Sequence, residues 1–314
     1  CGPFFGGALV TAFGWRSIFY LAVPLGMVTF AVSWAKLRGE WAEAKGEPFD
    51  WRGSLVYAAA ILLLICGASN LDKGLWAWLL ALCGTGGLIH FLILESHTEF
   101  PVLNVNLLRS NRVFAFSNLA AMLNYAATFG VTFFLSLYLQ YVKGLNPREA
   151  GTILIIQPIV QAAFSPLCGR LADRFSAATV ATIGMGLCAA GLAIAASITA
   201  TTSMLLIMVM LATLGLGFAL FSSPNISVIM GSVPPRYLGV ASGLNSTMRT
   251  LGMMASMTII TIIFSIFMAD HAVTPQTQPQ FLTSMHTALV TFSALCIVGI
   301  FFSIARIKKQ PDQK

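Results

Sequence analysis

The chain has 314 residues, of which 57% are hydrophobic and only 9% are charged, and its mean hydropathy is +0.82. A soluble domain carries about 25% charged residues, so this composition excludes an ordinary soluble domain and indicates a protein that crosses a membrane several times. The formal net charge of +7 is more typical of basic loops on one side of a membrane than of a nucleic-acid-binding surface, so we expect no nucleic-acid partner.

Apolar segments follow one another along the chain, separated by short turns that contain Pro, Gly, Asn or charged residues. Every segment except the first is long enough to span a hydrocarbon core of ~30 Å as a helix. The first is short and begins abruptly, like the back half of a helix. We predict an all-α polytopic membrane protein with about ten transmembrane helices. The segments cover residues 1–13, 17–35, 53–69, 76–95, 113–142, 149–168, 177–198, 204–231, 238–268 and 284–305.

Lys and Arg residues are distributed unequally between the two sides that these helices define. One side carries 13 of the 18 basic residues and the other carries 4. Basic loops stay in the cytoplasm, so the richer side is expected to be cytoplasmic and the C-terminus with it. The expected location is the plasma membrane, which is the inner membrane in a Gram-negative cell. The basic side consists of 36–52, 96–112, 169–176, 232–237 and 306–314.

The sequence shows no feature of an enzyme. It contains no Ser/His/Asp group, no phosphate-binding loop and no cluster with metal-ligand spacing. The six cysteines lie in apolar runs, and no pair has C-x-x-C spacing. We therefore expect no catalytic residue, no metal and no bound cofactor.

Several stretches carry a family resemblance, in the same order as in the family. Residues 1–7, CGPFFGG, resemble the end of the antiporter motif G-x-x-x-G-P-x-x-G-G, and the stretch that follows is GWRSIFYLAVPLG. Further along are LYLQYVKGLNPREAG, SPLCGRLADR and GVASGLNSTMRTLG. Together they resemble the fourteen-helix drug–proton antiporter branch of the major facilitator superfamily, with the first helices absent.

The resemblance implies the major facilitator fold and a division of the chain into four parts. Residues 1–35 would be the end of the N-terminal helix bundle, with part of the fifth helix and the sixth. Residues 36–112 would hold cytoplasmic loops and two linker helices. Residues 113–305 would form the C-terminal six-helix bundle, and residues 306–314 a cytoplasmic tail.

The opening motif is expected to form a bent helix with one glycine-lined face. Gly2, Gly6 and Gly7 allow two helix backbones to approach closely, and Pro3 removes a backbone N–H and bends the helix. Such a helix could seal against the other bundle and open by a small rotation. The alternative is a general packing face of small residues.

A second motif lies in the turn GRLADRF. It resembles the family's loop motif G-x-L-a-D-R-x-G-R-[RK], which implies a gate latch made by Gly169, Arg170, Asp173 and Arg174. The sequence departs from the motif after this point, where Ser and two Ala replace the second glycine and the last basic residues, so the latch is expected to be weakened. The alternative is a plain basic turn.

A cavity for amphiphilic compounds needs a few polar groups inside the C-terminal bundle. These groups could instead form hydrogen bonds between helices. Methionines are also frequent in these helices, and flexible thioethers suit promiscuous binding as well as ordinary packing. The cavity candidates are Asn124, Tyr125, Gln140, Gln157, Gln161, Asn225 and Arg249, and the methionines are Met208, Met210, Met230, Met253, Met254 and Met257.

Arg249 is the one basic residue inside a long segment. One interpretation is that it reaches headgroups or water at the start of its helix. The other is that it braces an inner gate by pairing across the bundle interface.

The expected function is secondary active transport by alternating access, most specifically proton-coupled efflux of drugs or other amphiphiles. The proton gradient is implied by the resemblance, as are the lipid bilayer and a small amphiphilic substrate as partners, with a periplasmic adaptor protein as a further partner if the protein is bacterial. The alternatives are an exporter of a specific metabolite in the same branch and a truncated remnant that does not transport.

Overall fold

The structure is a computed structural model that describes residues 9, 13–14, 16–36, 50–68, 70–98, 101–103, 105–268, 273–274 and 276–307. All regular secondary structure within these ranges is helical. Nine spans in the described ranges are long and apolar enough to cross a membrane. The prediction of an all-α polytopic membrane protein is therefore confirmed.

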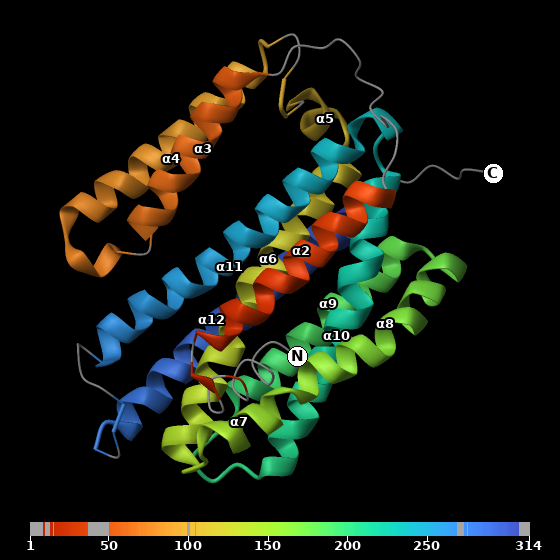
Figure 1. The fold of residues 1–314 in the computed structure, drawn as a ribbon. Coiled ribbons are helices and arrows are strands. Elements are labelled where there is room, and N and C mark those ends of the chain that lie inside the picture. The colour runs from red at the N-terminus through yellow and green to blue at the C-terminus, as the bar shows by residue number, and fades with distance from the viewer. Residues whose placement is uncertain are drawn as a thin grey trace.

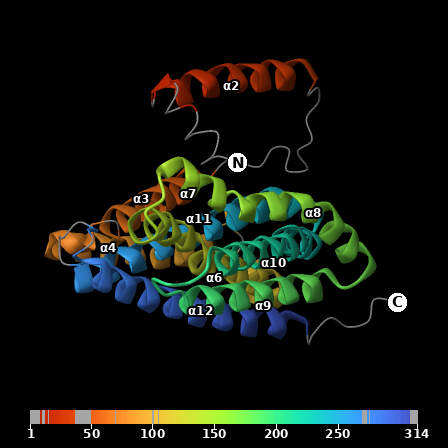
Figure 2. The same ribbon diagram turned by 90° about the horizontal axis from the view of Figure 1, so that it is seen from below.

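Helix α2 (Ser17–Lys36) stands apart from the other helices, as Figure 2 shows. None of the residues Phe19–Lys36 is buried, so the apolar surface of α2 is open on all sides. Helices α3 (Trp51–Ala68) and α4 (Leu75–Glu95) form an antiparallel hairpin, joined through the short 3₁₀ turn η1 (Leu71–Lys73) (Figure 1).

The α3–α4 hairpin packs closely because glycines face the neighbouring backbone. A Cβ on Gly67 would overlap Ala81 of α4, and a Cβ on Gly84 would overlap Leu64 of α3. Dispersion contacts of this kind are the main packing force between helices in lipid, so the hairpin forms its own unit beside the bundle.

The remaining helices build a bundle whose long members lie side by side in Figure 1. Helix α6 packs on α11 and α12, α10 packs on α8 and α9, and α9 packs on α12. The elements are α5 (Val105–Ser110), α6 (Arg112–Leu137), the π-helical turn η2 (Tyr138–Val142), α7 (Pro147–Leu154), α8 (Ile156–Arg174), α9 (Ala177–Ala196), α10 (Met204–Gly231), the 3₁₀ turn η3 (Pro235–Tyr237), α11 (Leu238–Met268) and α12 (Gln278–Ile307).

Local sequence explains where several of these helices begin and end. Asn146 and Glu149 form a capping box that starts α7. Pro158 has no N–H to donate to the carbonyl four residues earlier, at Leu154, and α7 ends at Leu154 while α8 begins at Ile156. The expected single segment 149–168 is thus two consecutive helices.

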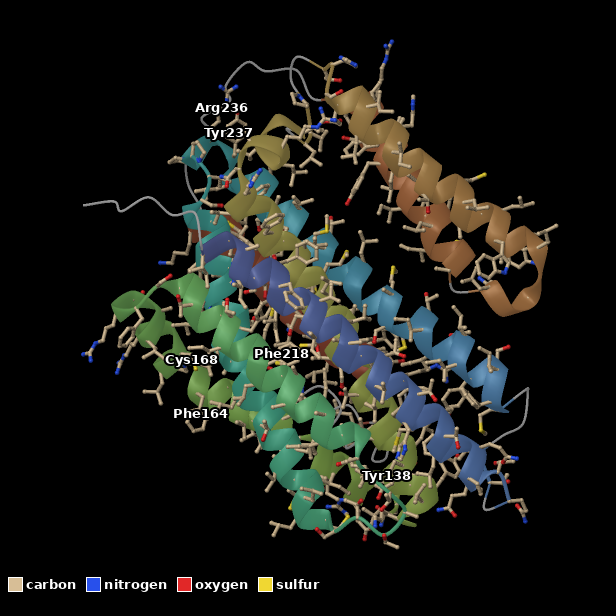
Figure 3. All side chains as sticks on the ribbon, turned by 180° about the vertical axis from the view of Figure 1, so that it is seen from behind. Tyr138, Phe164, Cys168, Phe218, Arg236 and Tyr237 are labelled. Atoms are coloured by element: carbon tan, nitrogen blue, oxygen red, sulfur yellow. The ribbon has the colours of Figure 1, made fainter. Side chains whose placement is uncertain are left out.

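The core of the bundle is built by α6, α9, α10, α11 and α12, and within it α9 and α10 approach closely. A Cβ on Gly184 would stand 2.5 Å from the backbone nitrogen of Phe221, and a Cβ on Gly217 would stand 2.8 Å from that of Cys188. Glycine at these positions lets the two backbones touch, which places α10 in the middle of the bundle. Figure 3 shows Phe218 of α10 midway along the bundle, with Tyr138 towards one end and Arg236 towards the other.

Candidate functional site

The centre of the candidate site is an aromatic and cationic group contributed by three helices. The rings of Tyr125 on α6 and Phe218 on α10 have centroids 5.9 Å apart. The guanidinium carbon of Arg249 on α11 lies 5.9 Å from the centroid of the Tyr125 ring, within the range of a cation–π contact. The structure therefore gives Arg249 an aromatic partner.

Arg249 is exposed, Tyr125 is half-buried and Phe218 is buried, so the group runs from the surface of α11 into the core of the bundle. The helix approach that creates the group depends on Gly252, because a Cβ there would overlap the backbone carbonyl of Met122 on α6. The guanidinium is thus held against α6 at a level where the two helices are in contact. Neither interpretation of Arg249 from the sequence included the ring.

A cavity of about 340 Å³ begins at Thr250, the residue that follows Arg249. It lies between α3 of the linker hairpin and the bundle helices α6 and α11. Its wall is apolar and rich in thioethers, which adapt to ligands of different shapes. The lining residues are Ile65, Ala68, Phe129, Thr250, Met253, Met254, Met257, Thr258 and Thr261.

Two amides with free hydrogen-bonding capacity lie on α8. Gln157 and Gln161 are four residues apart, hence on one face of the helix, and both are half-buried. Neither side chain makes a hydrogen bond in the described part of the chain. The Gln157 backbone packs against α10, since a Cβ on Gly215 would be 2.5 Å from the Gln157 carbonyl oxygen. These amides therefore lie beside the α10 segment that carries Phe218.

Asn124 and Gln140 lie on α6 and η2 but are not part of this group. Asn124 is 0% exposed, and neither atom of its side-chain amide has a hydrogen-bond partner within the described residues. Gln140 donates to the carbonyl and hydroxyl oxygens of Ser136, at 3.0 Å each, so its amide nitrogen is engaged within its own helix. A role for either residue in substrate binding stays a prediction.

Asn225 belongs to a different and fully buried network, organised by Arg306. The Arg306 guanidinium is 2% exposed and donates to Asn225 Oδ1, to Ser117 Oγ at 2.9 Å and to Ser303 Oγ at 2.9 Å. A weaker bond of 3.4 Å reaches the Ala178 carbonyl oxygen. The network joins α6, α9, α10 and α12 at one end of the bundle.

The sequence interpretation missed this network because it assigned residues 306–314 to the tail. In the structure Arg306 is the penultimate residue of α12. A signal was present in the sequence: Ser303 and Arg306 are three residues apart in an unbroken helical stretch, which puts both on the same face. Within the described residues no carboxylate pairs with Arg306.

The latch residues lie on the last turns of α8. Arg170, Asp173 and Arg174 are exposed, and Asp173 makes no ion pair with any described residue. A Cβ on Gly169 would meet nothing within 4 Å, so the close packing that this glycine would permit is not used here. The latch stays a prediction, as does the opening motif, because Gly2, Pro3, Gly6 and Gly7 lie outside the described residues.

No cluster of three or more His, Cys, Asp or Glu side chains that could hold a metal occurs among the described residues. What the arrangement offers is an aromatic group with one guanidinium, a neighbouring cavity lined by thioethers, and two free amides on α8. Pockets for small, partly apolar molecules are typically lined by groups of these kinds.

Comparison with known proteins shows which family the chain resembles. The family model described as Major Facilitator Superfamily matches residues 1–257. The chain is 28% identical over 316 residues to the riboflavin transporter RibZ of Clostridioides difficile (strain 630), and the match covers 98% of this chain and 67% of RibZ.

Two further relatives have names that refer to resistance. The multidrug resistance protein Stp of Mycobacterium tuberculosis (strain ATCC 25618 / H37Rv) is 28% identical, and the tetracenomycin C resistance and export protein of Streptomyces glaucescens is 27% identical. Each match covers 80% of this chain and 47% of the relative. The chain thus spans about half of the length of these relatives and about two thirds of RibZ.

Solved structures give the same fold. The POT family transporter PepTSo has a TM-score of 0.55 at 13% identity, covering 98% of this chain and 67% of that one. The nucleoside transporter NupG has a TM-score of 0.52 at 16% identity, covering 80% of this chain and 65% of that one. With a family match over most of its length and, among its described residues, nine spans long and apolar enough to cross a membrane, the chain is a multi-pass membrane protein that belongs to the Major Facilitator Superfamily.

Proposed function

We propose that the protein is a secondary active transporter that exports amphiphilic compounds in exchange for protons, by alternating access. The observation that carries the proposal is the contact of Tyr125 with Phe218 and Arg249, next to the apolar cavity between α3, α6 and α11. The aromatic rings and the methionine-lined cavity beside them suit apolar ligands of varied shape, and the free amides of α8 can orient polar ends.

The exposed guanidinium limits the charge of the substrate. Arg249 already occupies one side of the Tyr125 ring, and a cationic ligand placed there would be repelled. Neutral or anionic amphiphiles therefore fit this site better than cationic dyes do.

The chain order supports the fourteen-helix branch of the superfamily. The α3–α4 hairpin lies in the sequence between α2 and the bundle that starts at α6, where that branch has its two linker helices. The names of the Stp and tetracenomycin relatives support export, and the unequal distribution of basic residues supports a cytoplasmic C-terminus in the plasma membrane.

A second candidate is transport of one planar heteroaromatic metabolite. The Tyr125–Phe218 pair and the two free glutamine amides could stack and hydrogen-bond such a molecule, and a relative at 28% identity is named a riboflavin transporter. The two candidates differ in selectivity, because a general exporter accepts many amphiphiles and a metabolite carrier accepts one.

The test uses everted membrane vesicles from cells that express the protein from its full coding region. Respiration-driven accumulation is measured for a neutral amphiphile (N-phenylnaphthylamine), a cationic dye (ethidium) and riboflavin, with and without a protonophore. Protonophore-sensitive accumulation of the neutral amphiphile above that of ethidium supports the export proposal. Accumulation of riboflavin alone supports the second candidate. If no probe is transported, both candidates are refuted and the non-transporting alternative is left.

A further inference from the structure

An acidic pair lies at the open end of the linker hairpin, far from the aromatic group described above. Asp50 directly precedes α3, and Glu95 is the last residue of α4. Gly53 stands between them: a Cβ at this position would overlap both Glu95 Oε1 and Asp50 Oδ2. The two acid oxygens therefore border the same small space.

Each carboxyl group has one satisfied and one unsatisfied oxygen. Asp50 Oδ1 accepts from the Gly53 N–H at 2.8 Å, and Glu95 Oε2 accepts from the Leu103 N–H at 2.8 Å. Asp50 Oδ2 and Glu95 Oε1 are buried without a partner in the described part of the chain. Glu95 as a whole is only 2% exposed, and its unpartnered oxygen points at Asp50.

Two ionised carboxylates cannot be stable in this arrangement. Both facing oxygens would be acceptors, both would be out of contact with water, and their negative charges would repel. Among the described residues, Arg52 on α3, His97 after α4 and Arg109 on α5 form no ion pair with either carboxyl group, so no described side chain compensates the two negative charges. One of the facing oxygens must carry a positive partner.

The donor set favours a proton over a metal ion. Mg²⁺ and Ca²⁺ require about six to eight oxygen ligands, whereas this pair has two free oxygens, and its other two are occupied by N–H donors. A single proton turns one facing oxygen into a donor and the other into its acceptor, and it needs no further ligand.

We propose that Asp50 and Glu95 form a proton-binding site in which one proton is shared between the two carboxyl groups. The site is independent of the proposed transport function. The proton stabilises the contact between the two ends of the linker hairpin, and the segment that contains Leu103 is hydrogen-bonded to the Glu95 side of this contact. The contact is formed at low pH and is lost as the pH rises, because loss of the proton leaves two buried anions side by side.

Infrared spectroscopy of the whole chain in detergent micelles tests the proposal, because a protonated carboxyl group has a carbonyl band separate from those of carboxylates and amides. Spectra are recorded between about pH 5 and about pH 9, a range that extends well above the ionisation of an ordinary carboxyl group. Wild-type protein should show a carboxyl band at neutral pH, and both Glu95→Gln and Asp50→Asn should lose it. Glu149→Gln is the control, because Glu149 is an exposed acid, and it should keep the band.

A wild-type protein with no protonated carboxyl band at neutral pH overturns the proposal, and this result needs no variant. The proposal is also wrong if the band persists in both variants. A second measurement follows the segment itself, through the rate at which a cysteine placed at Val102 reacts with a maleimide. After correction for the fraction of this cysteine that is thiolate at each pH, the rate should rise with pH in the wild-type background and stay constant in the Glu95→Gln background. The same pH dependence of this rate in both backgrounds contradicts a proton that controls the exposure of the segment.

Discussion

Asn225→Leu should destabilise the bundle more than Arg306→Met, which removes the buried charge that Asn225 contacts. Asn225 accepts from Arg306 Nη1 and donates to the Ser117 carbonyl oxygen at 3.2 Å. A hydrogen bond to a charged group contributes about 1.5–3 kcal/mol in soluble proteins. Side-chain hydrogen bonds between membrane helices average about 0.6 kcal/mol, because the unfolded chain in lipid also finds partners.

The two effects together give a cost of about 2 kcal/mol for Asn225→Leu. Domains of 150–250 residues lose about 2–4 °C in Tm per kcal/mol, so the expected loss is about 4–8 °C. Arg306→Met also removes a charge that is costly to bury, so the double variant Asn225→Leu/Arg306→Met should be more stable than Asn225→Leu alone. Asn225→Asp should keep or raise the stability, since it supplies a counter-charge.

Thermal unfolding can be followed with a maleimide fluorophore that reacts as the buried thiols of Cys188 and Cys296 become accessible. The exposed Cys66 and Cys83, together with Cys1, are first replaced by Ser. Asn245→Leu is the matched control, because the Asn245 side chain makes no hydrogen bond in the described structure and should leave the Tm nearly unchanged. If Asn225→Leu also has no effect, or if the double variant loses the sum of both single losses, the network does not stabilise the bundle as described.

Three further predictions concern packing, orientation and the opening motif. Gly184→Ala should lower the Tm, since overpacking costs about 1–3 kcal/mol. Gly186→Ala on the same helix places its methyl group in open space and should keep or raise the Tm through helix propensity. Equal Tm shifts of the two variants in the same thiol assay would contradict this packing. In whole cells, a cysteine at Gln276 should react with an impermeant maleimide and one at Lys45 should not, and the reverse pattern would invert the topology. Gly6→Val should impair efflux while membrane insertion, followed by immunoblotting of the membrane fraction, stays normal, and unimpaired efflux would leave only a packing role.

The helices themselves could be predicted from the sequence because hydropathy alone defines them in a membrane protein. The segments 204–231 and 238–268 coincide with α10 and α11, and 17–35 differs from α2 by one residue. Residues 149–168 were expected to form one segment whose helix Pro158 interrupts, and the structure divides the segment there into α7 and α8.

The candidate site was harder to predict because hydropathy does not show which side of an apolar helix faces a neighbour. Tyr125 and Arg249 were both selected as polar groups at depth, but their contact depends on the register between α6 and α11 that Gly252 permits. Asn225 was selected for the same reason and instead contacts Arg306.

The acidic pair was also missed, since Glu95 lies at a segment end where a charged residue is expected to reach water. Its burial results from tertiary contacts: the chain after α4 folds back so that the Leu103 N–H caps one carboxylate oxygen. The distance of about 45 residues between the two acids gave no local pattern to recognise.

Export driven by a proton gradient through the Tyr125–Arg249 site is tested most directly by reconstituting the full-length protein in liposomes and imposing a pH gradient. The account predicts that N-phenylnaphthylamine moves against its own gradient, that Arg249→Ala lowers the rate at equal incorporation, and that Arg249→Lys retains part of the rate if charge alone matters and little if the planar guanidinium is needed on the ring. Wild-type rates in Arg249→Ala and in Tyr125→Ala, or no movement of the probe when the pH gradient is imposed, would contradict it.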